Sequence, residues 1–126
     1  MVKVIDSATT IEVTDVVASE AFYRKKLGFR PGFFYGEPPT FCIINRDRAT
    51  VFLDKARTPH PIPLNQYWAL YIYVDDVDMM YAEVKSRGVA IDRAIENQDY
   101  GCRDFDIRDP DGHLIGIGQN LTKQPV

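Results

Sequence analysis

The side chains best able to do chemistry in this sequence are two cysteines and two histidines. Cys42 and Cys102 stand alone, with no histidine or second cysteine at the short spacing of a zinc site. Neither has a recognisable base in the surrounding sequence, so the pattern favours small core or pocket residues over nucleophiles. His60 lies in a proline-rich run and His113 beside a turn, and we expect both at the surface. These four residues predict neither a metal centre nor a nucleophilic site.

The composition is typical of a small folded domain and excludes several classes of partner. The chain has 126 residues, with 15 Lys+Arg and 18 Asp+Glu, a net charge of −3 and 45% hydrophobic residues. A nucleic-acid partner is not expected, because binding phosphates requires clustered Lys and Arg. No apolar run reaches the roughly 18 residues of a membrane span, and the first residues lack the apolar stretch of a secretory signal. We therefore expect a cytoplasmic protein with no membrane partner.

The chain repeats one order of elements in its two halves. In each half, a short strand pattern is followed by an aspartate that suits a helix N-cap, by apolar residues at helical spacing, and by a glycine that ends the helix. The aspartates are Asp15 and Asp76, 61 residues apart, and the glycines are Gly28 and Gly88, 60 residues apart. This near-equal spacing predicts two half-domains of about the same length.

Strand patterns follow each predicted helix. The main predicted strands are 41–44 and 49–53, joined by a polar turn at 45–48, and 104–107 and 114–117, joined by the turn Asp109-Pro110-Asp111-Gly112. A further short strand is expected around 32–35 and around 90–94. The sequence thus predicts a first module at 1–57 and a second at 66–121, joined by an extended, proline-rich connector at 58–65.

Three segments, in this order, resemble the vicinal oxygen chelate superfamily. They are Ala21-Phe22-Tyr23 leading to Leu27-Gly28-Phe29, then Val74-Asp75-Asp76-Val77, then Asp109 to Ile115. This superfamily contains glyoxalase I, the extradiol dioxygenases, fosfomycin-resistance enzymes and the bleomycin-resistance proteins. The resemblance covers nearly the whole chain. It implies a single α+β domain in which two tandem βαβββ modules form a cup-shaped mixed sheet with the helices outside.

The resemblance also identifies where metal ligands would stand. Metal-dependent members carry them on the first and last strands of each module. The family's spacing places those positions at Ala8, Phe52, Ala69 and Gly116. None of these residues offers a ligand atom, and a shift of one residue does not supply two strong ligands. We therefore expect the fold of the family without its metal and without another cofactor.

Within the superfamily, the bleomycin-resistance proteins lack the metal site and act by sequestering a ligand. The run from Arg108 to Leu121 and the loop Tyr100-Gly101-Cys102-Arg103 resemble theirs. The resemblance implies that Tyr100 stacks on a planar part of the ligand and that the chain forms a homodimer. Arg103 places a cation nearby, which favours an anion or a carbonyl over a cationic drug.

Alternation along the predicted strands assigns further side chains to the cup. Tyr71 and Tyr73 would line it beside Phe41 and Phe52, or would be strand formers that pack against these two rings. Glu12 would face the cup as a solvated edge carboxylate, or as a general base if an apolar wall raised its pKa.

Small side chains beside these aromatic residues favour an open cavity. They are Ala8, Ala69 and Gly116, at the positions that carry metal ligands in relatives. Trp68 lies next to this face, either at a pocket rim or in a dimer interface.

Together these patterns predict a metal-free protein that sequesters a planar, partly aromatic small molecule, with antibiotics among the candidates. The candidate ligand-binding residues are Tyr71, Tyr73, Tyr100, Arg103, Trp68, Phe52, Phe41 and Glu12. Two alternatives stay open. One is a lyase, isomerase or dioxygenase with a divergent active site, and the other is an interaction module whose cup is closed by its own aromatic side chains.

Overall fold

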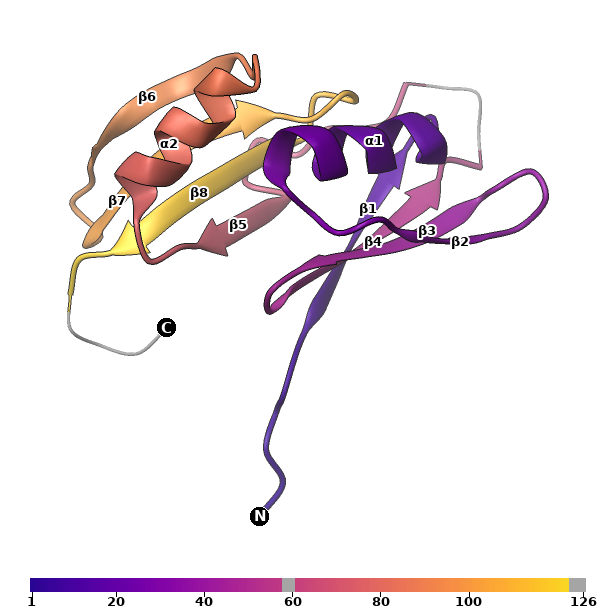
Figure 1. Ribbon diagram of the computed structural model, residues 1–126, viewed down its shortest axis with the longest axis horizontal. Coiled ribbons are helices and arrows are strands. Elements are labelled where there is room, and N and C mark those ends of the chain that lie inside the picture. Colours follow the sequence, from indigo (N-terminus) through magenta and orange to yellow (C-terminus); the bar gives the residue numbers. More distant parts are fainter. Residues whose placement is uncertain (58–60, 123–126) are drawn as a thin grey trace. The chain divides into compact units, whose positions relative to one another are not determined.

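The structure, a computed structural model, describes residues 1–57 and 61–122, and the chain divides into unit 1 (Met1–Pro63) and unit 2 (Leu64–Val126) (Figure 1). Unit 1 contains β1 (Ala8–Val13), α1 (Val16–Leu27), β2 (Phe33–Tyr35), β3 (Phe41–Arg46) and β4 (Ala49–Lys55). Unit 2 contains β5 (Leu70–Tyr73), α2 (Val77–Ser86), β6 (Ile91–Asn97), β7 (Cys102–Arg108) and β8 (Leu114–Asn120). The predicted tandem βαβββ arrangement is therefore confirmed.

Each unit has one four-stranded mixed sheet, and the two sheets share one topology. The strand order is β1-β4-β3-β2 in unit 1 and β5-β8-β7-β6 in unit 2. In each sheet the first and last strands of the module pair in parallel, and the other neighbours are antiparallel. The sequence repeat is thus a repeat of strand pairing as well as of element order.

The helix ends lie close to the predicted capping residues. The Asp15 carboxylate accepts a hydrogen bond from the backbone N–H of Ala18, at 3.1 Å, and Gly28 ends α1 with a φ of 72°. The Asp76 carboxylate accepts from the backbone N–H of Met79, at 3.0 Å. α2 ends at a cap on Arg87, one residue before Gly88, whose φ of 81° turns the chain toward β6.

One face of each sheet is packed against its own helix and holds the core. In unit 2, Phe105, Ile107, Ile115 and Ile117 are fully buried on that face, and the Phe105 ring contacts Tyr81 of α2 with centroids 4.9 Å apart. Each such side chain contributes roughly 1.5–3 kcal/mol by its burial. Because neighbouring residues on a strand point to opposite faces, the residues between them lie on the other face, which we call the helix-free face.

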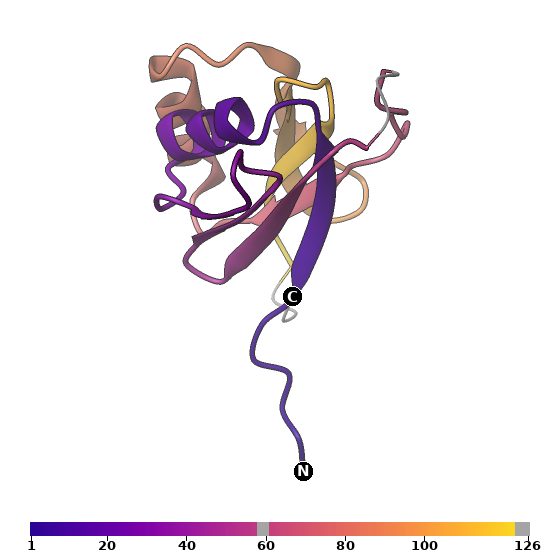
Figure 2. The same ribbon diagram turned by 90° about the vertical axis from the view of Figure 1, so that its right-hand side faces the viewer.

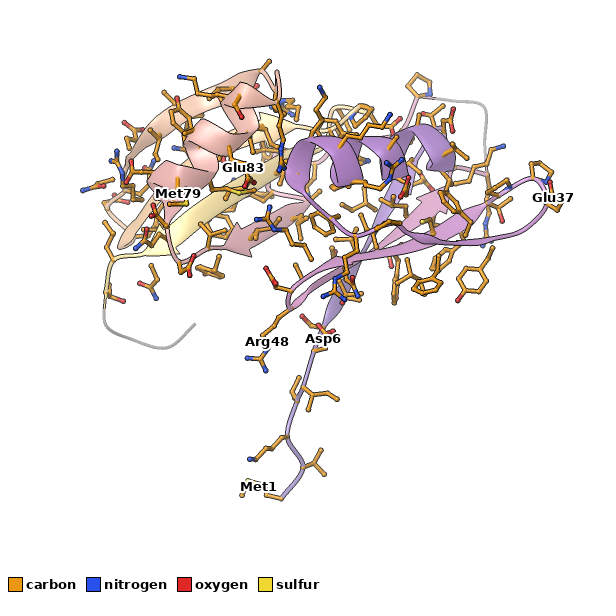
Figure 3. The ribbon with its side chains drawn as sticks, in the orientation of Figure 1. Met1, Asp6, Glu37, Arg48, Met79 and Glu83 are labelled. Atoms are coloured by element: carbon orange, nitrogen blue, oxygen red, sulfur yellow. The ribbon has the colours of Figure 1, made fainter. Side chains whose placement is uncertain are left out.

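Two sequence predictions about loops are wrong. The turn between β3 and β4 has two residues and not four, because β3 continues through Arg46, which pairs with Ala49. Figure 3 labels Arg48 in this turn, where the preceding Asp47 has a φ of 51°. His113 is buried and not at the surface, and its backbone N–H donates to Asp109 Oδ1 at 2.9 Å. His60 lies outside the described residues.

The N-terminal segment runs away from β1 as an extended strand-like stretch (Figure 2). Its apolar side chains Val2, Val4 and Ile5 are more than four-fifths exposed. Among the described residues, no helix has the length and apolar character that crossing a membrane requires.

Candidate functional site

Residues from all four strands of unit 2 meet on the helix-free face of its sheet. The strand register places Tyr71, Gly116 and Asp106 opposite one another on β5, β8 and β7, and pairs Asp106 with Arg93 on β6. Two residues further along β5 and β8, Tyr73 and Gly118 lie opposite each other, and Gly118 lies opposite Asp104 on β7. Two aromatic residues, two glycines and two carboxylates therefore lie side by side on this face.

The two glycines make room for aromatic rings. A Cβ atom on Gly116 would lie 2.6 Å from Trp68 Nε1 and 2.6 Å from Tyr71 Cδ2. A Cβ atom on Gly118 would overlap the Tyr71 hydroxyl. The expectation of open space beside Gly116 is therefore wrong, because the Trp68 and Tyr71 rings occupy it.

Four aromatic side chains form a continuous group on this face, which we call the ring cluster: Trp68, Tyr71, Tyr73 and Tyr100. Trp68 contacts Tyr71 and Tyr100 with centroids 4.8 and 6.2 Å apart, and Tyr71 contacts Tyr73 at 5.0 Å. Each contact is edge-to-face. Trp68, Tyr73 and Tyr100 remain 39%, 53% and 51% exposed. The cluster thus presents aromatic surface to solvent.

Three of the four rings in the cluster donate hydrogen bonds to two buried carboxylates, Asp104 and Asp106. The Trp68 indole N–H donates to Asp106 Oδ1 at 2.8 Å. The Tyr71 hydroxyl donates to Asp104 Oδ2 at 2.8 Å, and the Tyr100 hydroxyl donates to the same oxygen. These bonds fix the orientation of three rings against the strand that carries both aspartates.

Arg93 joins the two carboxylates. Its Nη2 donates to Asp104 Oδ1 at 2.6 Å and to Asp106 Oδ1 at 3.1 Å, and its Nε donates to Asp106 Oδ2 at 2.9 Å. The Asp104 and Asp106 side chains are 0% and 9% exposed, whereas Arg93 is 30% exposed. Glu96 approaches Arg93 Nη1 at 3.9 Å from the solvent side. All four aspartate oxygens therefore accept at least one hydrogen bond.

These contacts fix which groups are charged. Burial disfavours the ionised form of Asp104, but hydrogen bonds from Tyr100, Arg93 and Tyr71 outweigh it and lower its pKa. Burial, together with the hydrogen bond to Asp104, raises the pKa of Tyr71 and the pKa of Tyr100 above that of an ordinary phenol. At neutral pH Asp104 is therefore an ionised acceptor, and the two phenols are neutral donors.

Arg103 lies on the other face of β7. Its Nη2 contacts Asp78 Oδ1 of α2 at 3.1 Å, and its Nη1 donates to Asn97 Oδ1 at 3.1 Å. Its neighbour Phe105 packs against the same helix. The structure therefore does not bring Arg103 to Tyr100 as a polar anchor, and the arginine behind the ring cluster is Arg93.

The candidate residues of unit 1 lie on the helix-free face of the other sheet. The Phe41 and Phe52 rings contact each other with centroids 5.6 Å apart, and Tyr35 contacts Phe41 at 6.0 Å. Glu12 is exposed on β1 and pairs in register with Asp54 on β4, which in turn pairs with Phe41. Unit 1 thus carries a group of aromatic side chains on the helix-free face of its own sheet.

The four positions expected for metal ligands do not fit a metal. Ala8, Phe52, Ala69 and Gly116 have no donor atoms in their side chains, and Gly116 is covered by Trp68. Within residues 1–57 and 61–122, no group of three or more His, Cys, Asp or Glu side chains could hold a metal ion. Asp104 and Asp106 instead bind Arg93 and the ring cluster.

The cysteines are buried. Burial, with a smaller contribution from the nearby Glu20 carboxylate, raises the pKa of the Cys42 thiol to about 11. A thiol of this kind is protonated at neutral pH and is a poor nucleophile. Cys102 is buried on β7 next to Tyr100 and Gly101 in sequence.

Sequence reasoning missed Arg93, Asp104 and Asp106. A signal for the aspartates was present, because they alternate with the apolar Phe105 and Ile107 inside a predicted strand. Such alternation places both carboxylates on one face. Arg93 has no such signal, since its pairing with Asp106 follows an irregular register between β6 and β7.

Comparison with known proteins identifies the family. The model of the Glyoxalase/Bleomycin resistance protein/Dioxygenase superfamily matches residues 5–117. The chain belongs to this superfamily. Among curated proteins, none matches the chain significantly.

Several solved structures share the fold of this chain at low sequence identity. TioX from Micromonospora sp. ML1 has a TM-score of 0.75 and 17% identity, with 92% of this chain and 98% of that chain covered. A glyoxalase-related enzyme from Clostridium phytofermentans has a TM-score of 0.75 and 16% identity, covering 94% and 97%. Lactoylglutathione lyase from Agrobacterium tumefaciens has a TM-score of 0.69 and 22% identity, covering 90% and 92%.

Proposed function

We propose that this member of the superfamily is a metal-free binding protein that sequesters a planar, partly aromatic small molecule. The ring cluster of unit 2 is the observation that carries the proposal. Three of its four rings are between 39% and 53% exposed, yet three of the four are held by hydrogen bonds to buried carboxylates. Aromatic surface with a few fixed polar groups is what a flat ligand needs for stacking and orientation.

The chemistry of the site favours binding over catalysis. Asp104 is neutralised by Arg93 and accepts from two phenols, so it is a weak base. The Tyr71 and Tyr100 phenols have raised pKa values and are poor acids at neutral pH. The positions that carry metal ligands in relatives have no donor atoms. The exposed part of the cluster is therefore mainly aromatic ring surface, which suits stacking on a ligand.

The fluorescence of Trp68 tests the proposal, because it is the sole tryptophan and lies within the ring cluster. A panel of planar aromatic compounds and antibiotics is titrated into the protein, with thermal shift as the second readout. We expect at least one compound to change Trp68 emission saturably and to raise the melting temperature. No response across the panel would contradict the proposal.

Two variants and one control then locate the binding site. Tyr73→Ala and Tyr100→Ala each remove one exposed ring, and we expect each to weaken binding by about two- to tenfold, the value of one aromatic contact. Met79→Ala is the control, because it removes an exposed apolar side chain from α2, where Figure 3 labels it. An equal loss of affinity in Met79→Ala would mean that the compound does not bind at the ring cluster.

A lyase, isomerase or dioxygenase with a divergent active site is the competing enzyme assignment. Metal analysis of purified protein separates the two. The binding-protein proposal expects less than stoichiometric divalent metal, whereas one tightly bound ion per chain would contradict it.

A closed interaction module is a second candidate, favoured by the rings that lie over Gly116 and Gly118. In that case the cluster serves packing and its exposed edges contact a protein. The module predicts no change in Trp68 emission with any compound of the panel, so the same titration distinguishes it from the binding protein.

The proposal includes a homodimer. It is supported by exposed aromatic side chains on β2, an edge strand of the unit 1 sheet. Phe33 and Tyr35 of this strand are 72% and 53% exposed. Exposed aromatic residues on an edge strand suit contact with a second copy. Light scattering should report a dimer for the natural chain and a monomer for Phe33→Asp; a monomeric natural chain would contradict this part of the proposal.

A further inference from the structure

Asp104 and Asp106 are two carboxylates buried close together, an arrangement that disfavours ionisation of both. They are two residues apart on β7, so their side chains lie on one face, and both are buried. Both Oδ1 atoms contact the same nitrogen, Arg93 Nη2, which makes the carboxylates close neighbours. Two buried carboxylates this close cannot both stay ionised without a cation, and one would take up a proton.

The ring cluster depends on both carboxylates being acceptors. Each of three rings donates its N–H or O–H to one of them: Trp68 to Asp106, and Tyr71 and Tyr100 to Asp104. A protonated carboxyl keeps only part of its acceptor capacity and becomes a donor itself. Protonation of either aspartate would therefore weaken the contacts that orient the rings.

We propose that Arg93 is the positioning residue of the ring cluster, because its guanidinium keeps Asp104 and Asp106 ionised together as the acceptors that orient Trp68, Tyr71 and Tyr100. The guanidinium suits this role, since its planar fork contacts both carboxylates at once through Nε and Nη2. Arg93 does not contact a ring donor itself and acts through the aspartates. That the oriented rings bind a ligand rests on the proposed function, whereas the control of ring orientation by Arg93 does not.

Groups from every strand of this sheet bear on the titration. β6 contributes Arg93 and Glu96, whose carboxylate lies 3.9 Å from Arg93 Nη1. β5 contributes the Tyr71 phenol, and the loop before β7 contributes the Tyr100 phenol. β7 itself also contributes the Cys102 thiol, which interacts with the Tyr71 hydroxyl. β8 contributes Gly116 and Gly118, which have no titratable side chain. Arg93 is thus the cation that directly contacts both aspartates, and Glu96 adds further negative charge beside it.

Trp68 emission in the ligand-free protein tests the proposal, so the outcome is independent of whether a ligand binds. The emission maximum is measured across pH for the natural chain, Arg93→Gln and Arg93→Lys. We expect a constant maximum from about pH 5 to about pH 8 in the natural chain. In Arg93→Gln we expect a shift to longer wavelength and a maximum that changes with pH within this range, as one aspartate takes up a proton.

Arg93→Lys and Arg108→Gln serve as matched variants. Lysine keeps the charge and loses the fork, so we expect little pH dependence but a partly shifted emission maximum. Arg108 is on the same strand pair, and its side chain contacts Asp92 at 3.2 Å and the Gly112 carbonyl at 2.9 Å, not Asp104 or Asp106. Arg108→Gln should therefore leave both the emission maximum and its pH profile unchanged.

A flat pH profile and an unshifted maximum in a folded Arg93→Gln would overturn the proposal. If that variant does not fold, NMR titration of the Asp104 carboxyl carbon in the natural chain replaces it. The proposal expects the pKa of Asp104 below its ordinary value of 3.8. A pKa at or above that value would overturn the role of Arg93.

Discussion

The indole of Trp68 lies directly over Gly116, so closely that a Cβ atom on the glycine would be 2.6 Å from Nε1. The family resemblance would place a metal ligand at this glycine. The residue has no side chain, and an aromatic ring from the segment before β5 lies over it. The glycine thus makes room for the ring.

Gly116→Ala tests that relationship. The added methyl group must displace the Trp68 or Tyr71 ring, and overpacking of this kind costs about 1–3 kcal/mol of folding free energy. Urea unfolding measures the loss, and Trp68 emission should shift because its bond to Asp106 is disturbed. An unchanged unfolding free energy together with unchanged emission would show that the ring does not rest on the glycine.

The tyrosines of the ring cluster should resist alkaline titration. Folding raises the pKa of Tyr71 and Tyr100 above the ordinary value of 10.0, so these phenols stabilise the fold below that pH and the contribution is lost as pH rises beyond it. Tyrosinate absorbance should show a fraction that appears only when the chain unfolds, and Tyr71 and Tyr100 should belong to it. In Tyr71→Phe plus Tyr100→Phe, that late fraction should be smaller. An unchanged late fraction in the double variant would contradict the assignment.

Acid should destabilise unit 2 through Asp104. The folded state lowers the pKa of Asp104, so its contribution is present above the ordinary value of 3.8 and is lost as pH falls below it toward the lower folded value. The melting temperature should therefore fall as the pH is lowered below 3.8. In Asp104→Asn this part of the pH dependence should be smaller, at a lower melting temperature throughout. An Asp104→Asn profile parallel to that of the natural chain would count against the buried pair.

Arg103→Gln tests whether Arg103 contacts the ligand, as the sequence predicts, or only Asp78, as the structure shows. Because Arg103 contacts Asp78 on the helix side of the sheet, its loss should leave the binding of any planar compound unchanged within about twofold. The stability cost should also be small, about 0–1 kcal/mol, since both side chains of the pair are partly exposed. Weaker binding in Arg103→Gln, at unchanged stability, would place this arginine at the ligand after all.

The repeated fold could be predicted because its signals are local. Asp15 and Asp76 each accept a hydrogen bond from the backbone N–H three residues later in the sequence. Gly28 adopts the left-handed conformation that few other residues adopt easily. Strand alternation also placed Tyr71 and Tyr73 on one face. Such features depend on neighbours within a few residues, so the sequence alone contains them.

The polar half of the site could not be predicted because it depends on register between strands. The hydrogen bond between Tyr71 and Asp104 joins residues 33 positions apart in the sequence, and the bond between Trp68 and Asp106 joins residues 38 positions apart. The irregular pairing of β6 with β7 brings Arg93 to the carboxylates. Arg103 does not reach them because it alternates with Asp104 along β7 and so lies on the opposite face of the sheet.

The most direct test of the binding proposal is the NMR signal of the Trp68 indole N–H, which is a single resonance because the chain has one tryptophan. It is followed while a planar aromatic compound that raises the melting temperature is added. We predict that this resonance and those of Tyr73 and Tyr100 shift together and saturate at one compound per chain. Saturable binding that leaves the Trp68 resonance in place would contradict the binding proposal.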